Sequence, residues 1–537
     1  MTRRQATRSA PTWWAFAGLL ATALLGGCSG DEHAEADLDG HDHGGHGDLE
    51  VDGSDAGHDD TDHGGLDTDP GSADGSGDLL EDWPVFEDTF QEGSGFSIQQ
   101  GRLALEARAS TAAIRPGRPT AVWGYNGSVP AGPIRVRQGE SLTVAFTNRI
   151  PLGTTVHWHG IAQQVAYDGV PGLPNDGSAP PHPLLKTGQS RDYPIETGRT
   201  GTFWFHPHYK TSEELDRGLQ GVILIEEANP PRVDRDLVWV VDDWMLGDDN
   251  QIVPLYQGLI YQLHGGIIGN TITVNGREKY AIELPAGALV RLRIVVTSNA
   301  RTHRIRLPDG LGAQVVASDG GYVQAPYAVT ELFASPAERY ELVFRVPDRP
   351  GERLRFTTEN YILPHTLPLA QVVVGPAEAS RAPDWVHPAV EIPDRSAEAT
   401  RDPDFTITLG GSQPPEAVDD NFMWAINGHS HSEGDSMAHD EPLATFDLGR
   451  EYRIDVDNVN GYRFGHPLHI HGVVFQVLDI GGVAPPSRMW KDTVWLPPES
   501  RARLVMRAEP AGQWMVHCHI LEHQARGMMS RIDIVAP

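Results

Sequence analysis

The chain has 537 residues, including 41 prolines and 58 glycines, so it is too long for one compact core and is predicted to form several domains of short strands joined by turns. Its formal net charge is −31, and the 54 acidic and 39 basic residues of 83–537 still leave −15, which argues against a nucleic-acid partner. Only one of its two cysteines lies beyond residue 28, which excludes an intrachain disulfide in the folded part.

Residues 1–27 have the layout of an export signal, with three early arginines, an apolar run from Trp13 to Leu25, and then small residues. The run is shorter than the ~20 residues that span a bilayer, so a cleaved signal is favoured over a permanent transmembrane helix. The sequence "LLGGC" resembles a bacterial lipobox, which implies that Cys28 is the lipidated first residue of the mature protein. We therefore expect an exported protein of the cell envelope whose membrane link is a lipid anchor; without acylation of Cys28 it is simply periplasmic or secreted.

Residues 28–85 are predicted to be a disordered, acidic, His-rich tether. Between residues 31 and 82 there are nineteen acidic side chains and no lysine or arginine, so this stretch cannot bury enough apolar surface to offset its ordering entropy. Its histidines are compatible with weak metal binding and equally with a solubilising spacer: His33, His41, His43, His46, His58 and His63.

Three later stretches share one plan, a glycine followed by alternating apolar residues. They begin at Gly139 ("GESLTVAFTN"), Gly287 ("GALVRLRIVV") and Gly449 ("GREYRIDVDN"). Period-two alternation is typical of half-buried strands, and its recurrence indicates three similar domains. We predict an all-β chain of three consecutive β-sandwiches, with domain ranges 86–230, 231–395 and 396–537.

Histidine motifs follow the repeated strand in the first and third of these domains only. The first domain carries "HWHG" and "HPH", and the third carries "HPLHIHG" and "HCH". At the equivalent place the middle domain has a lone His303, so it is predicted to be a metal-free spacer. The motif histidines are His157, His159, His206, His208, His466, His469, His471, His517 and His519.

The spacing of these motifs suggests a cluster of metals. On a strand, residues i and i+2 point to the same face, so each His-x-His presents two imidazoles side by side. Four such pairs supply eight imidazoles, which is twice what one tetrahedral site requires. The sequence therefore predicts a site of several metal ions between the first and third domains.

Cys518 lies between two of these histidines and should face the opposite way. There it can join His466, His523 and a weak Met528 around one further metal. Two imidazoles, a thiolate and a distant thioether describe a blue-copper electron-transfer site; zinc also accepts such ligands, but the neighbouring imidazole cluster favours a redox metal. The strand itself then forms a covalent electron path on the order of 10 Å long.

The four motifs, in this order, resemble those of the multicopper oxidases, the laccase-like enzymes of three cupredoxin domains, over roughly residues 90–537. The resemblance implies four copper ions: one type 1, one type 2 and two type 3. Carried over by position, His466, Cys518, His523 and Met528 would bind the type 1 copper. His157 and His469 would hold the type 2 copper, and the type 3 pair would be held by His159, His206, His208, His471, His517 and His519.

The family's activity implies that the type 1 copper takes electrons singly from a donor and that the other three coppers reduce dioxygen to water. Phenols or aromatic amines are the favoured donors, reached by outer-sphere transfer through an accessible His466 or His523. A metallo-oxidase for cuprous or ferrous ion is the main alternative, disfavoured by the scarcity of methionines, of which there are nine. A non-enzymatic copper buffer is a further alternative, and the oligomeric state stays open.

Oxygen reduction needs protons, and a carboxylate near the cluster is a sensible relay. Asp168 in "AYDGVPG" resembles the family's acidic residue at this place. Bacterial relatives commonly have glutamate directly after the type 1 histidine, where this chain has Gln524, and Glu522 is the candidate to compensate.

The remaining histidines fall into two groups. Five are isolated and are interpreted as packing or surface residues: His182, His264, His303, His365 and His387. The stretch "NGHSHSEGDSMAH" is a candidate for metal entry or substrate gating, with a plain solvent-exposed loop as the alternative; it contains His429, His431, Met437 and His439.

Overall fold

The computed structural model describes residue 79 and residues 81–537, except 94, 259–260, 262–264, 362–364, 379–380, 412–422, 432–440 and 461–463. The described residues belong to one compact unit, whereas the leader and most of the predicted tether lie outside them. None of the helices in the described part of the chain combines the length and the apolar character needed to cross a membrane.

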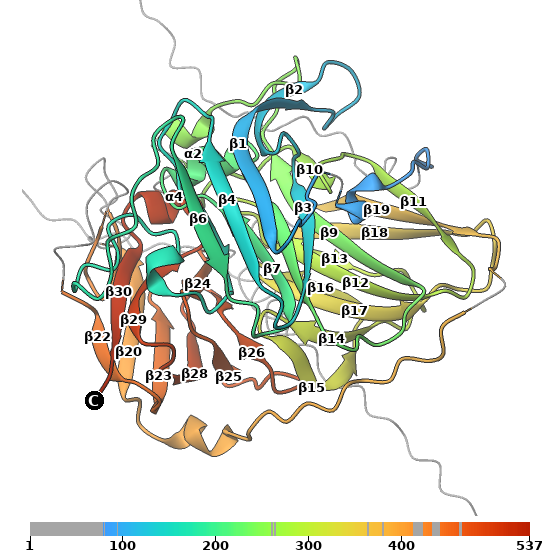
Figure 1. Ribbon diagram of the computed structural model, residues 1–537. Coiled ribbons are helices and arrows are strands. Elements are labelled where there is room, and N and C mark those ends of the chain that lie inside the picture. The colour runs from blue at the N-terminus through green and yellow to red at the C-terminus, as the bar shows by residue number, and fades with distance from the viewer. Residues whose placement is uncertain are drawn as a thin grey trace, which may run out of the picture. The chain divides into compact units, whose positions relative to one another are not determined.

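The first domain is a sandwich of two sheets (Figure 1). One sheet has the order β2-β1-β4-β6 and consists of β1 (Arg102–Ala112), β2 (Thr120–Tyr125), β4 (Leu142–Asn148) and β6 (Ser190–Ile195). The other has the order β3-β8-β7-β5 and consists of β3 (Ala131–Arg137), β5 (His157–His159), β7 (Gly201–His206) and β8 (Gly221–Glu226). Three short helices accompany it: η2 (Thr89–Glu92), η3 (Val165–Tyr167) and α2 (Thr211–Asp216).

The middle domain also has two sheets. The first, β10-β9-β12-β17-β14-β15, comprises β9 (Arg235–Trp244), β10 (Thr271–Val274), β12 (Leu289–Val296), β14 (Gln314–Ser318), β15 (Gly321–Ala328) and β17 (Arg339–Arg345). The second, β11-β19-β18-β13-β16, comprises β11 (Tyr280–Pro285), β13 (His303–Arg306), β16 (Glu331–Ala334), β18 (Arg353–Asn360) and β19 (Thr366–Gly375). The short helix η4 spans Leu255–Gln257.

The third domain repeats this arrangement. Its first sheet, β21-β20-β23-β28-β25-β26, contains β20 (Phe405–Gly411), β21 (Trp424–Ile426), β23 (Glu451–Asn458), β25 (Phe475–Ile480), β26 (Trp490–Lys491) and β28 (Arg501–Arg507). Its second, β22-β30-β29-β24-β27, contains β22 (Ala444–Asp447), β24 (His466–Ile470), β27 (Thr493–Leu496), β29 (Gly512–Cys518) and β30 (Met529–Val535). The helices are η5 (Ser396–Thr400) and α4 (Leu521–Ala525).

The internal repeat seen in the sequence is a repeat of topology. In each domain the glycine-led strand pairs in parallel with the first long strand: β4 with β1, β12 with β9, and β23 with β20. Each second sheet contains one parallel pair as well: β3 with β8, β11 with β19, and β22 with β30. The prediction of an all-β chain of three cupredoxin-like sandwiches is therefore confirmed, whereas the domain boundaries themselves remain predictions.

The burial of the repeated strands agrees with the predicted alternation only in part. In β4 every second side chain is buried, as expected for a strand with one face on a core. In β12 both faces are buried, so the expectation of a half-buried strand is wrong there. Its outward side chains Arg291 and Arg293 form ion pairs with Glu341, with N–O distances of 2.6 and 2.9 Å, and Arg293 also donates to Thr202 of the first domain.

The end of the predicted tether is ordered. Trp83 is 2% exposed, its backbone N–H donates to the side chain of Gln371, and Asp82 pairs with Arg355 of the middle domain. The expectation of disorder through residue 85 is thus corrected for residues 81–85, because burial of the Trp83 side chain and these polar contacts offset the entropy lost on ordering this short stretch.

Candidate metal centre

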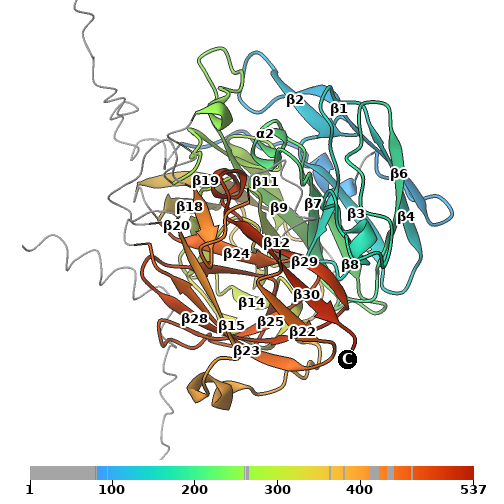
Figure 2. The ribbon, with the colours of Figure 1, turned by 90° about the vertical axis from the view of Figure 1, so that its left-hand side faces the viewer.

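Strand pairing brings the four histidine motifs together in two pairs. In the first domain β5 and β7 are antiparallel neighbours, with His157 opposite His206. In the third domain β24 and β29 are antiparallel neighbours, with His469 opposite His517. The two strand pairs lie side by side where the first and third domains meet (Figure 2).

The eight imidazoles predicted to bind the copper cluster form one buried group. Rings from different domains stack, with centroids 3.9 Å apart for His157 and His471 and 3.7 Å apart for His159 and His469. Nitrogens of three different triplets lie within 4.8 Å of one another: His157, His159 and His206; His208, His471 and His517; and His157, His469 and His471. His519 lies beside this group, with its ring centroid 5.2 Å from that of His159 and 5.3 Å from that of His206.

Hydrogen bonds to the backbone fix which nitrogen of several imidazoles is free. The Nδ1 of His157, His206, His469 and His517 lies 2.7, 2.8, 2.9 and 3.0 Å from a carbonyl oxygen. A carbonyl can only accept, so each Nδ1 carries the proton and each Nε2 presents a lone pair. Such a partner on the far nitrogen is the usual support of a metal-binding histidine.

The ring nitrogens that have no hydrogen-bond partner also indicate that this group of histidines fits metal ions. Among the described residues, the buried Nε2 atoms of His157, His206, His208 and His469 have no hydrogen-bond partner, nor has either nitrogen of His519. Buried polar atoms are rarely left unpaired, so several of them converging on one place indicate a missing ligand. Bound copper satisfies such lone pairs, and imidazole is a ligand copper favours.

Electrostatics keep these imidazoles in the form that binds metal. Burial, reinforced by neighbouring imidazoles, lowers the pKa well below its usual range for His159, His206, His208, His469, His471 and His519. Burial likewise lowers the pKa of His517 to about 3. These seven rings are therefore neutral at physiological pH, with their lone pairs available.

A second, smaller group surrounds Cys518. Its Sγ lies 3.5 Å from Nδ1 of His466 and 3.8 Å from Nδ1 of His523, and these two nitrogens are 3.2 Å apart. Ligand atoms bound at about 2.0–2.3 Å to one metal have separations of this size. Met528 is buried, and its carbonyl accepts a hydrogen bond from the N–H of Cys518. Burial raises the pKa of the Cys518 thiol, so the thiolate needs a bound cation to form.

Neither imidazole of the Cys518 group is accessible, contrary to the expectation from the sequence. His466 and His523 are both 0% exposed. The side chain of Asn460 lies 2.9 Å from Nε2 of His466, and the ring of Trp424 packs 4.0 Å from that of His523, centroid to centroid. An electron from a donor must therefore pass through a covering side chain.

Asp168 links the two histidine-bearing domains. Its carbonyl accepts the hydrogen bond from His157, and its Oδ2 lies 2.6 Å from Nδ1 of His471. Gly169 follows with φ of 94°, and a Cβ there would collide with the carbonyl of Val156. The Asp-Gly turn thus permits the close approach that places Asp168 against the cluster.

Gln524, which replaces the family's glutamate, and Glu522, the candidate to compensate for it, both lie on α4 and are hydrogen-bonded to other domains. Glu522 is buried, which raises the pKa of its carboxyl, and it accepts hydrogen bonds from Ser212, Asn299 and the N–H of Ile267 at 2.5, 3.1 and 3.1 Å. Gln524 donates to the hydroxyl of Thr211 at 3.3 Å. These contacts join α4 to the first and middle domains.

Three of the isolated histidines have ordinary packing partners. His182 bonds to Tyr193, His303 lies between the hydroxyls of Ser298 and Thr358, and His387 bonds to the carbonyl of Val323. His365 is exposed, and His264 lies outside the described residues.

The candidate entry loop lies beside the Cys518 group in its described part. The backbone N–H of His431 donates to the carbonyl of Gly527, which precedes Met528, and a Cβ on Gly527 would lie 3.1 Å from the Met423 methyl carbon. His429 precedes this contact by two residues, whereas Met437 and His439 lie outside the described residues.

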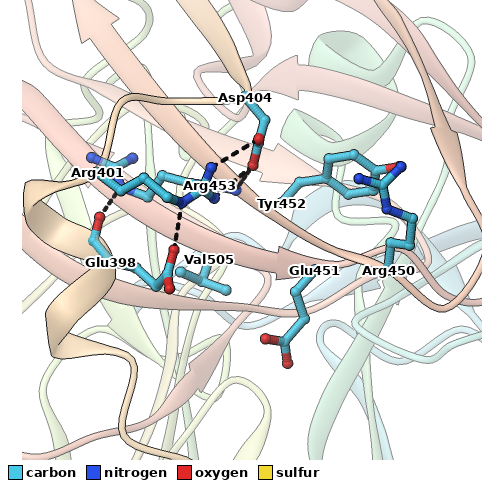
Figure 3. Close-up of a pocket in the computed structure, with 8 residues that line it drawn as sticks. All are labelled: Glu398, Arg401, Asp404, Arg450, Glu451, Tyr452, Arg453 and Val505. Atoms are coloured by element: carbon cyan, nitrogen blue, oxygen red, sulfur yellow. Dashed lines mark hydrogen bonds and ion pairs between the residues drawn. The ribbon is translucent and has the colours of Figure 1, made fainter.

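A surface pocket of about 310 Å³ (Figure 3) shares no lining residue with either group. It is lined by charged side chains of the third domain that already pair with one another, such as Arg401 with Glu398 and Asp404. It offers no unpaired arginine for an anion, and we assign it no role.

Sequence reasoning missed three residues next to the cluster. Asp492 and Thr493 contact Nε2 of His159 at 3.2 and 3.1 Å, and Arg339 of the middle domain pairs with Asp492. No local pattern singles them out, because their partners are 333, 334 and 153 residues away in the chain.

Comparison with known proteins agrees with the class that this fold and donor set define. Three sequence profiles described as multicopper oxidase match residues 106–230, 235–356 and 412–536, which together make up more than half of the chain. The chain belongs to the multicopper oxidase family and is an oxidoreductase of that family.

The match with similar proteins extends over most of the length of each relative. The multicopper oxidase MmcO of Mycobacterium tuberculosis is 28% identical, over 76% of this chain and 82% of the relative. The crystal structure of a multicopper oxidase from Pseudomonas thermotolerans is 29% identical with a TM-score of 0.68, over 81% of this chain and 99% of the other. A laccase-like multicopper oxidase from Ochrobactrum sp., with oxidase activity towards lignin model compounds, is 26% identical with a TM-score of 0.70, over 81% and 97%.

Proposed function

We propose that this multicopper oxidase couples the one-electron oxidation of a small organic donor, a phenol or an aromatic amine, to the four-electron reduction of dioxygen to water. One observation carries the proposal. Cys518 belongs to a group with His466 and His523, while its sequence neighbours His517 and His519 belong to the imidazole cluster. One short stretch of backbone thus joins an electron-accepting site to a site with many nitrogen donors.

Each donor group has a proposed occupant. His466, Cys518, His523 and Met528 would hold type 1 copper; His157 and His469 would hold type 2 copper; and the type 3 pair would be held by His159, His206, His208, His471, His517 and His519. Bound copper would supply both the electron-transfer step and the reduction of dioxygen, since copper cycles between two oxidation states.

The chain's own residues prepare that chemistry. Asn460 and Trp424, both buried, pack against His466 and His523 and help to keep water from the Cys518 group. Asp168 fixes the ring of His471 through its Oδ2, and as a carboxylate in contact with the cluster it is proposed to pass protons to it.

The donor class is supported by the closed environment of the Cys518 group. An electron from an organic donor can cross the buried side chains that cover this group, whereas a metal ion would need ligands along a path into the protein. The Ochrobactrum relative, whose described activity is towards lignin model compounds, has the same fold.

A second candidate, a metallo-oxidase for cuprous or ferrous ion, is favoured by one observation. Met423 lies directly before β21 and next to Gly527, and His429 and His431 follow the same strand; thioether and imidazole suit cuprous ion. A copper buffer without turnover is the third candidate, for which the His-rich tether is the motivation.

Oxygen uptake by the copper-loaded chain separates the three candidates. We expect uptake with a diphenol, and at a lower rate with cuprous or ferrous ion. Oxygen uptake with cuprous or ferrous ion but not with the diphenol would establish the metallo-oxidase and refute the phenol oxidase. No uptake with any of these donors, from a fully loaded protein, would leave the buffer.

We also propose that the protein is exported and anchored to the cell envelope through lipidated Cys28. Mass spectrometry of the mature N-terminus tests this. A diacylglyceryl mass on Cys28 is expected, and a free amine at a nearby residue would refute the anchor.

A further inference from the structure

The middle domain, expected from the sequence to be a spacer, sends one buried side chain to the edge of the imidazole cluster. Arg339 is the first residue of β17 and is 1% exposed. Its guanidinium forms a two-point pair with Asp492 of the third domain, with both N–O distances at 2.6 Å. Such bidentate pairs fix direction as well as distance.

Every donor of this guanidinium has an acceptor. Besides the two bonds to Asp492, its Nε donates to the carbonyl of Thr202, and its Nη1 and Nη2 donate to the carbonyls of Ala337 and Asp319 at 3.2 and 3.1 Å. A guanidinium has five N–H groups, so none is left over. Because the acceptors come from all three domains, Arg339 is held rigidly at the junction of the domains.

Asp492, held in place by Arg339, contacts His159, a predicted copper ligand. Its Oδ1 lies 3.2 Å from Nε2 of His159, and the hydroxyl of Thr493, which donates to the same Oδ1 at 2.9 Å, lies 3.1 Å from that nitrogen. An ionised carboxylate can only accept, so Nε2 of His159 carries the proton.

His159 therefore presents the opposite nitrogen from its neighbours. In His157, His206, His469 and His517 the backbone holds Nδ1 and leaves Nε2 for a metal. In His159 the lone pair is on Nδ1, which is buried and has no hydrogen-bond partner among the described residues.

Gly160 shows how closely the pair approaches this histidine. Its φ is 85°, and a Cβ there would collide with the Arg339 guanidinium and lie 2.7 Å from Oδ2 of Asp492. The glycine after His159 thus makes room for the ion pair, and the pair in turn packs against the backbone that carries the ligand.

A carboxylate oxygen of Asp492 and one ring nitrogen each of His159 and His469 lie within 4.8 Å of one another, so Asp492 could itself be a metal ligand. Both of its oxygens, however, are engaged by Arg339, and Oδ1 also accepts from Thr493. This makes it a partner of the ligand rather than a ligand.

We propose that Arg339 and Asp492 are a positioning pair that holds His159 in the tautomer and orientation in which Nδ1 binds copper. The middle domain then sets the geometry of a metal site to which it contributes no ligand. The inference rests on the proposed copper sites, and neither residue touches the reacting atoms.

The test changes both members of the pair together, because removing one leaves an uncompensated buried charge. Arg339→Met with Asp492→Leu removes the carboxylate that accepts from His159 and leaves only the hydroxyl of Thr493 beside Nε2. Arg339→Met with Asp492→Asn is equally neutral but keeps an amide oxygen facing Nε2. Arg453→Met with Asp455→Leu is the matched control, since that pair of the third domain is also buried, with side chains 1% and 4% exposed.

Three quantities are measured on each copper-loaded protein: the blue absorption, the copper retained against a chelator, and the EPR spectrum of the bound copper. In the Leu variant we expect the blue absorption to persist, while copper of the imidazole cluster is held about 10–100-fold more weakly, with an altered EPR spectrum. The Asn variant should recover much of the loss, and the control should match the wild type.

Two results would overturn the proposal: cluster copper and EPR spectrum unchanged in the Leu variant, or the same loss in the Arg453 control. If the Leu variant does not fold, Arg339→Lys decides, because lysine keeps the charge but loses the two-point contact. An altered cluster EPR spectrum then supports the proposal and an unchanged one refutes it. A wild-type chain that takes up no copper would instead refute the proposed function.

Discussion

Asp168 connects two imidazoles that come from different domains. Its carbonyl accepts from His157 and its carboxylate holds His471. Both contacts are to the ring nitrogens turned away from the cluster, so this residue orients ligands and at the same time places a carboxylate beside them.

Asp168→Asn tests whether this carboxylate carries protons. An amide retains much of the shape but cannot shuttle a proton, so turnover should fall roughly 10²-fold while the blue absorption stays. Oxygen uptake and the visible spectrum measure the two effects. Asp176→Asn, a change to an exposed carboxylate in the same segment, should leave both unchanged. Wild-type turnover in Asp168→Asn would remove the relay from the account.

His303 provides a pH test separate from the metal sites. Burial lowers its pKa from 6.5 to about 3, so below pH 6.5 the unfolded chain binds a proton that the folded chain refuses. Stability is therefore lost as the pH falls from 6.5 towards 3, by about 1.4 kcal/mol per unit for this residue.

His303→Gln should remove that contribution. Melting temperatures at pH 7 and pH 5 are compared, and the variant should lose less on acidification than the wild type. His365→Gln, at an exposed position, is the control and should behave as the wild type does. An equal loss in all three proteins would show that His303 is not the buried neutral group described.

Residues with a local pattern could be predicted, and those with only distant partners could not. The eight imidazoles and Cys518 were identifiable because alternation along a strand assigns each side chain to a face. Arg339 and Asp492 carry no such pattern; their roles arise from pairing between β17 and the segment before β27, which the sequence does not reveal. The exposure of His466 and His523 was wrongly predicted, since covering side chains such as Trp424 come from elsewhere in the fold.

At the scale of elements, the motifs lie at the ends of strands. Only β5 contains a complete His-x-His; β7 ends at His206 and β29 at Cys518, so His208 and His519 continue the alternation just past the last ladder bond. The alternation thus extends two residues beyond β7 and one residue beyond β29, so the faces assigned from the sequence also hold for His208 and His519.

Strand β12 shows where the same argument fails. Its charged residues Arg291 and Arg293 suggested an exposed face, yet both are buried against acidic partners at the border with the first domain. Alternation of residues along a strand shows which face is polar but not whether that face is exposed, because a polar face can be buried when its charges are paired.

The tether is predicted to affect copper supply rather than turnover. Deleting residues 31–82 should slow copper loading at limiting copper, because six histidines and nineteen carboxylates are removed. The loaded enzyme should turn over as before. A variant with only the six histidines changed to serine separates their effect from length. Unchanged loading, or a lower rate in the loaded enzyme, would contradict the prediction.

At the scale of the whole molecule, three sandwiches of one topology divide the work. The first and third domains supply every predicted copper ligand, and the middle domain joins them through buried ion pairs, Arg293 reaching the first and Arg339 the third. Sequence repeats were sufficient to count the domains. The repeats could not predict these contacts between domains, because the residues of such ion pairs do not recur at a regular spacing in the sequence.

The central claim is that Cys518 binds one copper while His517 and His519 bind others, and the visible spectrum together with the copper content of the loaded protein tests it most directly. We expect a blue protein with four copper ions per chain, and a colourless Cys518→Ser variant that keeps the copper of the imidazole cluster. A colourless wild type, or one that holds far fewer than four ions, would contradict the account.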